Sequence, residues 1–134
     1  MPYLQLDVPT RYPVELKRQA ALRFAALYAR IMQTSIDRVT VGFRELGEGN
    51  LWSALGGEPE PAAILMCDVR SGRPPEQRAE LAQALIDICV ELLGLRSDRL
   101  VVEFTQHTGD EMYRAAGGWG PDWSKVEAET NTSV

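Results

Sequence analysis

The sequence predicts an α/β (α+β) protein in which two tandem βαβ units form one four-stranded mixed sheet with two helices on one face. Two long segments carry apolar residues at helical spacing, and each lies between two short strand-like stretches. The chain also matches itself when it is shifted by 61 residues, so that Asp7 falls on Asp68. Its composition, 45% hydrophobic and 25% charged in 134 residues, is typical of a single soluble domain.

Proline residues mark the start of both predicted helices. The first helix is expected after Pro13, and the second after Pro74 and Pro75, because a proline fits the first turn of a helix. The second helix is expected to end at Gly94, a natural C-terminal cap. The apolar positions at helical spacing are Val14, Leu16, Ala20, Ala21, Phe24, Leu27, Tyr28 and Ile31, then Leu81, Leu85, Ile88, Cys89 and Leu92.

Four short aliphatic stretches flank these helices and are expected to be strands. They cover residues 2–8, 38–45, 63–69 and 99–105. A strand–helix–strand crossover makes the two strands of each unit parallel. Two such units side by side give the mixed sheet, and the sheet face without helices is then expected to pack against other subunits.

The internal repeat sets the expected organisation of the chain. Pairs such as Pro13 and Pro74, or Arg38 and Arg99, keep the same spacing without a gap. We therefore expect one domain, residues 1–134, made of two pseudo-repeats, 2–46 and 63–107. Residues 47–62 would connect them through a short hairpin or turn, and residues 108–134 would form a C-terminal tail.

Charge and composition exclude several classes of function. The net charge is −5 and the basic residues form no run, so nucleic acid is not an expected partner. Cys67 and Cys89 lie in apolar contexts and are expected to be reduced core residues, and one histidine does not make a metal centre. No apolar run approaches the roughly 18 residues of a membrane span, and no signal peptide is evident. We expect a cytoplasmic protein without metal or cofactor.

Pro2 is the first candidate catalytic residue. Removal of Met1 would expose its secondary amine, a compact base that titrates near neutral pH when it is desolvated or close to cations. The alternative is that Pro2 only begins an edge strand, where its missing N–H costs nothing. The repeat favours the first interpretation, because the matching residue in the second half is Ala63.

The second half carries an arginine turn that the first half lacks. Residues 68–73 end a predicted strand and lead into a helix, which is a common place for anion binding. Arg70 and Arg73 flank a Ser-Gly turn and can direct their planar guanidinium groups at one carboxylate. The matching positions are Pro9 and Tyr12. The alternative is that both arginines are ordinary exposed residues.

These features resemble the tautomerase superfamily. Pro2 after Met1, the duplicated βαβ unit and the stretch Cys-Asp-Val-Arg-Ser-Gly-Arg are most similar to its cis-3-chloroacrylic acid dehalogenase-like branch, over roughly residues 2–114. The resemblance implies the tautomerase/MIF-like fold, a homotrimer, and a catalytic amino-terminal proline. It also implies substrates that are small 2-oxo acids, their enols or unsaturated three-carbon acids, with Arg70 and Arg73 holding the carboxylate.

Three positions depart from the pattern of the branch. Tyr28 stands where the cis-dehalogenase has a histidine, and Glu103 where it has a tyrosine. Arg114 stands where the cis-dehalogenase and the related trans-dehalogenase have the glutamate that activates water. An arginine does not accept a proton from water at neutral pH. We therefore expect proton transfer rather than water activation, with Arg70, Arg73, Arg114, Tyr28 and Glu103 as candidate substrate-binding residues. Arg114 adds a third positive charge, which suits a dicarboxylate.

The sequence thus leads to one main hypothesis and two alternatives. The main hypothesis is enol–keto tautomerisation of a small 2-oxo acid, with Pro2 as general base and acid and with arginines stabilising the enolate charge. The first alternative is a dehalogenase or hydratase acting on an unsaturated three-carbon acid. The second is a non-catalytic, anion-binding regulatory domain in which Pro2 has no chemical role.

The tail and the single histidine carry weaker expectations. Trp119 and Trp123 lie among glycines, and we expect them to fold back over an apolar surface, as a wall of the pocket or as a contact with another subunit. His107 follows a predicted strand and is expected at the surface.

Overall fold

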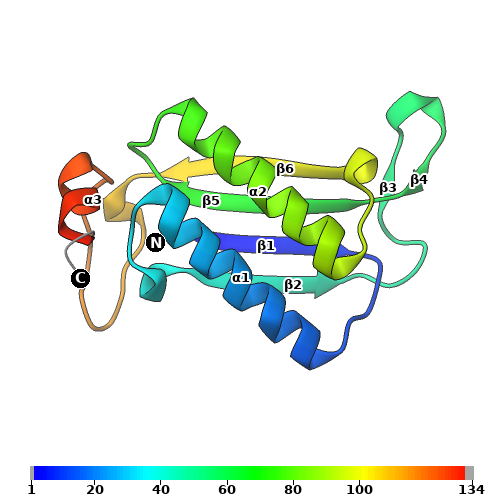
Figure 1. Cartoon of the computed structure of the whole chain (residues 1–134), viewed down its shortest axis with the longest axis horizontal. Helices are drawn as coiled ribbons and strands as arrows, with labels where there is room; N and C mark the ends of the chain where they lie inside the picture. Colours follow the sequence, from blue (N-terminus) through cyan, green and yellow to red (C-terminus); the bar gives the residue numbers. More distant parts are fainter. Residues whose placement is uncertain (1, 132–134) are drawn as a thin grey trace.

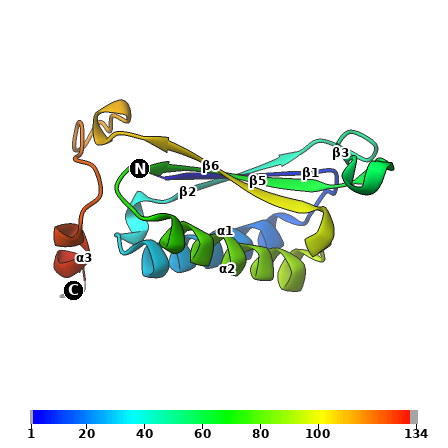
Figure 2. The same cartoon turned by 90° about the horizontal axis from the view of Figure 1, so that it is seen from above.

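The computed structural model describes residues 2–131 and shows a four-stranded sheet with two long helices on one face (Figure 1, Figure 2). The strand order is β2-β1-β5-β6, in which β1 and β2 are parallel, β5 and β6 are parallel, and the central pair β1 and β5 is antiparallel. These elements are β1 (Tyr3–Val8), α1 (Val14–Met32), β2 (Thr40–Glu45), β5 (Ala63–Arg70), α2 (Pro75–Leu93) and β6 (Leu100–His107). The predicted mixed sheet with both helices on one face is confirmed.

The register of the central strands shows how the two repeats are related. Gln5 of β1 lies opposite Met66 of β5, which is its own counterpart 61 residues later. Leu4 pairs with Cys67 and Leu6 with Leu65, so the pairs are symmetric about that central point. The two βαβ units are therefore related by an approximate two-fold rotation, and equivalent residues lie at opposite ends of the sheet.

The core lies between the helices and the sheet. Alternate residues of β1 and β5, such as Leu6 and Leu65, are fully buried against α1 and α2. Phe24 and Leu85 contribute the helical side of this core. Within residues 2–131, no helix covers the opposite sheet face, which carries the partly exposed Met66.

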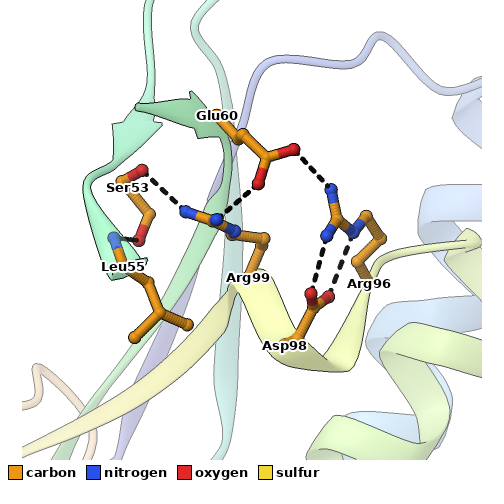
Figure 3. A network of polar contacts seen from close by, with 6 residues as sticks. All are labelled: Ser53, Leu55, Glu60, Arg96, Asp98 and Arg99. Atoms are coloured by element: carbon orange, nitrogen blue, oxygen red, sulfur yellow. Dashed lines mark hydrogen bonds and ion pairs between the residues drawn. The ribbon is translucent and has the colours of Figure 1, made fainter. Parts of the chain in front are cut away.

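A small hairpin stands between the repeats, at the end of the sheet where β6 begins (Figure 1). Its strands are β3 (Trp52–Ser53) and β4 (Glu60–Pro61). Arg99 fastens it by donating to the carbonyl of Ser53 at 2.8 Å and by pairing with the carboxylate of Glu60. Figure 3 shows this network, which Arg96 and Asp98 extend.

The tail after β6 crosses the opposite end of the sheet and finishes in a short helix, α3 (Lys125–Asn131), beyond the start of β1 (Figure 1, Figure 2). A 3-10 turn at Gly109–Glu111 begins it, with Thr108 and Glu111 forming a capping box. Within residues 2–131, no helix is both long enough and apolar enough to cross a membrane.

Candidate active site

The topology gathers the candidate residues at the tail end of the sheet, where β1 and β2 begin and β5 and β6 finish. Pro2 is buried immediately before β1, and its carbonyl accepts a 3.2 Å hydrogen bond from the Thr40 amide at the start of β2. Tyr3 pairs with Asp68, two residues before Arg70. Pro2 and the arginine turn, far apart in sequence, therefore share one end of the sheet.

Arg70 is buried beneath the tail rather than exposed. Its side chain is 3% exposed, with Nη1 donating to the Pro121 carbonyl at 2.9 Å and Nη2 donating to the Glu127 carboxylate at 2.6 Å. Nε is buried without a partner among the described residues. Both outer nitrogens of the guanidinium group are therefore occupied by the tail.

Glu127 is held by two donors. The hydroxyl of Thr34 also donates to its carboxylate. Burial by itself raises the pKa of the Glu127 carboxyl, but the hydrogen bonds from Arg70 and Thr34 outweigh this effect and hold that pKa below its ordinary value. The side chain is consequently an anion at neutral pH, paired with the buried cation Arg70.

Arg73 is packed between aromatic rings. Its guanidinium carbon lies 5.0 Å from the centre of the Trp123 ring and 5.8 Å from that of Tyr28. Nε donates to the Met32 carbonyl at 3.0 Å, which satisfies a terminal carbonyl of α1. Burial lowers the pKa of this guanidinium. Arg73 therefore fastens the end of α1 under the tail and has little surface left for a ligand.

Tyr28 lies in the core beneath Arg73. It is fully buried, and its hydroxyl has no partner among the described residues. Burial raises the pKa of this phenol to about 12, although the positive charge of Arg73 acts in the opposite direction. At neutral pH Tyr28 is thus a neutral phenol with an unused hydrogen-bond donor.

A cavity of about 200 Å³, here called the arginine cavity, opens beside Arg70. It is lined by Arg38, Arg70, Arg114, Met112, Trp119 and Pro121 together with four glycines. Reciprocal backbone hydrogen bonds between Arg114 and Gly118 hold the rim. The side chains of Arg38 and Arg114 form no hydrogen bond or ion pair with residues 2–131. Two unpaired cations and one buried cation therefore give this small space a positively charged lining.

Trp123 presses the tail against the arginine turn. Its amide donates to the Ser71 carbonyl at 3.0 Å and its indole nitrogen to the Gln33 carbonyl at 2.9 Å. Gly72 has φ +131°, and a Cβ at this position would lie 2.2 Å from the Trp123 carbonyl oxygen. Trp123 thus covers the turn. Trp119 lines the arginine cavity, as expected for a wall of the pocket, and packs edge-on against Tyr113.

Two other candidates lie elsewhere. Glu103 pairs with Met66 in the middle of β6, four residues before the strand end, which is roughly 13 Å along the strand. The chain does not bring it to the arginine cavity. The expectation of a surface His107 is wrong: its side chain is 8% exposed, and Nδ1 lies 2.8 Å from Asp68. Strand patterning does not show this burial or the contact with Asp68.

Sequence reasoning missed Arg38, Thr34 and Glu127. Arg38 stands before β2, and the parallel pairing of β2 with β1 places it beside the start of the N-terminal strand. The predicted topology contained that signal. Thr34 and Glu127 meet across 93 positions of sequence, and no spacing or motif indicates their contact. Among the described residues, no group of three or more His, Cys, Asp or Glu side chains is arranged to hold a metal ion.

Comparison with known proteins places the fold. No family model matches the chain, and no curated protein matches it. Solved structures do match. N1, a member of the cis-3-chloroacrylic acid dehalogenase family, is 18% identical with a TM-score of 0.79, over 98% of this chain and 99% of that one. Pt0534 inactivated by 2-oxo-3-pentynoate is 23% identical with a TM-score of 0.75, over 96% and 97% of the two chains.

A third similar structure is the Q0 fused 4-OT wild type symmetric trimer. It is 18% identical with a TM-score of 0.76, over 88% of this chain and 94% of that one. All three are structures of the tautomerase superfamily. The chain therefore has the tautomerase/MIF-like fold, as the resemblance of its repeat and motifs implied.

Proposed function

We propose that the protein is a tautomerase-type enzyme that moves a proton on a small 2-oxo or enol carboxylic acid. The observation that carries this proposal is the placement of Pro2 at the same end of the sheet as the arginine cavity. The fold, shared with tautomerase-superfamily enzymes, supports an isomerase-like role. Arg70, with Arg38 and Arg114, supplies positive charge for the substrate carboxylate.

The chemistry requires only a proton shuttle and a grip on the carboxylate. After removal of Met1, the Pro2 amine accepts the enol O–H proton, and the electron pair of that bond remains on oxygen as an enolate. The arginines stabilise this negative charge. The protonated amine then returns the proton to carbon, which gives the ketone and restores the free base. Positive charges nearby favour the unprotonated amine before the reaction begins.

Arg73 contributes to the proposed site through its neighbours. Its Nη1 lies 3.4 Å from the carbonyl oxygen of Arg70, and its ring contacts fix the turn between them. Tyr28 supports Arg73 from below and presents its unused hydroxyl in the same region. In this proposal Arg70 binds the carboxylate, while Arg73 and Tyr28 keep the turn in place.

Covalent labelling tests the role of the Pro2 amine directly. The triple bond of 2-oxo-3-pentynoate is conjugated with a ketone, so a free amine adds to it, forming an N–C bond and passing a proton to the neighbouring carbon. We expect one adduct per chain, equal to the whole mass of the reagent, and peptide mapping that places it on Pro2. Pyruvate in excess would slow the reaction. An unlabelled Pro2, or one that still carries Met1, contradicts the proposal.

We also propose that the active form is a homotrimer, as in the fused 4-OT trimers of the same fold. The sheet face without helices carries Met66 and Val101, which are 37% and 58% exposed in the single chain. It also carries Glu103, one of whose carboxylate oxygens is buried without a described partner. Light scattering is expected to give three times the chain mass of 14.9 kDa; a monomer would contradict the trimer.

Dehalogenation or hydration is the second candidate, because Glu127 brings a carboxylate to the site. Its lowered pKa keeps it deprotonated, which is the state needed to accept a proton from water. The same oxygen, however, is bonded to both Arg70 and Thr34, which favours the tautomerase. Halide release from the two isomers of 3-chloroacrylate separates the candidates: rapid release supports the hydrolytic enzyme, and none supports the tautomerase.

A further inference from the structure

Glu127 stands in the position that an incoming carboxylate would need. It contacts Nη2 of Arg70 at 2.6 Å, and the Pro121 carbonyl accepts from Nη1, so the tail binds both terminal nitrogens of the guanidinium group. The third nitrogen of the group, Nε, is buried without a described partner. A substrate carboxylate reaches a two-pronged contact with Arg70 only when the tail gives up its place.

The helix that carries Glu127 needs contacts with the rest of the protein to be stable. α3 has 7 residues, too few to be stable by itself in water. A cavity of about 640 Å³ lies between it and the ends of α1 and α2, lined on one side by Gln33, Gly72 and Gln77 and on the other by Lys125 and Ala128. Glu127 reaches inward to Arg70 and Thr34 and anchors this helix to the body of the protein.

The burial of the contact explains why the chain supplies a carboxylate there. Arg70 is 3% exposed, and an isolated guanidinium in such a place carries a large desolvation cost. Arg38 and Arg114 add positive charge around the same space. An internal anion that offsets Arg70 while the site is empty keeps the arginine turn formed.

We infer that Glu127 is a resident carboxylate which occupies Arg70 in the empty protein and is exchanged for the carboxylate of the ligand. This inference rests on the proposed anion site, and it adds a selection step to that site. A ligand with a carboxylate displaces Glu127 and releases α3. A neutral ligand of the same shape does not displace Glu127, because it has no negative charge to replace the ion pair with Arg70.

The exchange has a thermodynamic consequence. The apparent affinity for a carboxylate is its intrinsic affinity reduced by the small fraction of protein in which Arg70 is free. Replacing Glu127 by glutamine removes the negative charge and raises that fraction. Glu127→Gln is therefore expected to bind pyruvate about ten-fold or more tightly than the unaltered protein. The affinity for methyl pyruvate, which is uncharged, is expected to stay the same.

Calorimetry with pyruvate and methyl pyruvate tests the inference on the full chain, with Glu129→Gln as the matched control. Glu129 is on the same helix and loses the same charge, whereas the carboxylate paired with Arg70 is that of Glu127. Tighter binding of pyruvate by Glu127→Gln alone supports the exchange. Equal or weaker binding overturns it and makes the ion pair purely structural. Absence of pyruvate binding in all three proteins overturns it as well.

Hydrogen exchange of the unaltered protein provides a second test that does not depend on how a variant folds. At saturating pyruvate, the backbone amides of α3 are expected to exchange faster, since the helix loses its anchor. Slower exchange there overturns the inference. Neither experiment requires turnover, so a protein without tautomerase activity can still show the exchange, and an active enzyme can still fail to show it.

Discussion

The two ends of the sheet carry equivalent arginines in opposite electrostatic settings. Arg99 and Arg38 occupy the same position in the two repeats, each at the end of a short 3-10 turn before the outer strand of its unit. Arg99 pairs with Glu60 and donates to the Ser53 carbonyl (Figure 3). Arg38 has no such partner within residues 2–131 and lines the arginine cavity instead.

In the network at the hairpin end, positive and negative charges are balanced. Arg96 binds Asp98 at 2.6 Å and reaches Glu60 at 3.4 Å, so two cations meet two anions. At the tail end, Arg38, Arg70 and Arg114 surround one cavity. The only ion pair that these three form with the described residues is the one between Arg70 and Glu127. This difference between the two copies supports our proposal that an anionic ligand binds at the tail end.

Replacing Arg38 and Arg99 in turn by alanine tests this contrast. These substitutions have the largest expected effect. Arg38→Ala is expected to lower kcat/KM for an enol acid by about ten-fold to a hundred-fold, with little change in stability, because it removes charge from the cavity. Arg99→Ala is expected to lower the free energy of unfolding by about 1–2 kcal/mol and to leave kcat/KM nearly unchanged. Steady-state kinetics and urea unfolding of both variants measure the two quantities.

The reverse result would contradict the proposed difference between the two ends of the sheet. If Arg99→Ala lost activity while Arg38→Ala lost only stability, the site would lie at the hairpin end.

A second pair of equivalent residues in the two repeats clarifies the role of Arg73. Its counterpart Tyr12 donates its hydroxyl to the Leu93 carbonyl at 2.8 Å, just as Arg73 donates to the carbonyl of Met32. Tyr12→Phe loses one hydrogen bond and is expected to cost about 1 kcal/mol of unfolding free energy. Arg73→Ala also loses its two ring contacts and is expected to cost about 3 kcal/mol. Urea unfolding measures both; equal costs would show that the ring contacts add nothing.

The smallest expected effect is a titration difference among the 4 tyrosines. Burial raises the pKa of Tyr28 to about 12, above the ordinary value of 10 in the unfolded chain. The neutral phenol is thus favoured in the folded state, so its contribution to stability is complete below pH 10 and is lost as the pH rises through 12. Absorbance at 295 nm is expected to show Tyr28 titrating late, and this late step is expected to vanish in Tyr28→Phe.

Titration of Tyr28 near the ordinary pKa of 10 would contradict this account. It would mean that water reaches the Tyr28 hydroxyl beneath Arg73. Tyr12 provides an internal reference, because burial also raises the pKa of its phenol above 10.

The fold was predictable because the repeat can be recognised in the amino-acid sequence. Equal spacing from Asp7 to Arg38 and from Asp68 to Arg99 fixes two copies of one unit, and crossover geometry then fixes the parallel strand pairs. Comparison of the two copies also identified the arginine turn. The rules of strand pairing and crossover geometry were sufficient to predict the fold, because they depend only on local sequence pattern and on how the chain connects its elements.

The tail was not predictable in the same way. Its position depends on single contacts between distant residues, such as the indole nitrogen of Trp123 with the Gln33 carbonyl. Strand and helix periodicity carries no information about such contacts. For this reason Arg70 was predictable at the end of β5 and Arg73 in the turn after it, whereas their burial and the presence of Glu127 came only from the structure.

The most direct test of the central claim is the activity of Pro2→Ala on phenylenolpyruvate, measured with protein whose amino terminus has been verified by intact mass. Arg96→Ala, which removes a positive charge at the balanced end, is the control. We expect Met1 to be absent from the unaltered protein and kcat/KM to fall at least about a hundred-fold in Pro2→Ala but not in Arg96→Ala. Full activity in Pro2→Ala, or in a protein that retains Met1, would contradict proton transfer by the Pro2 amine.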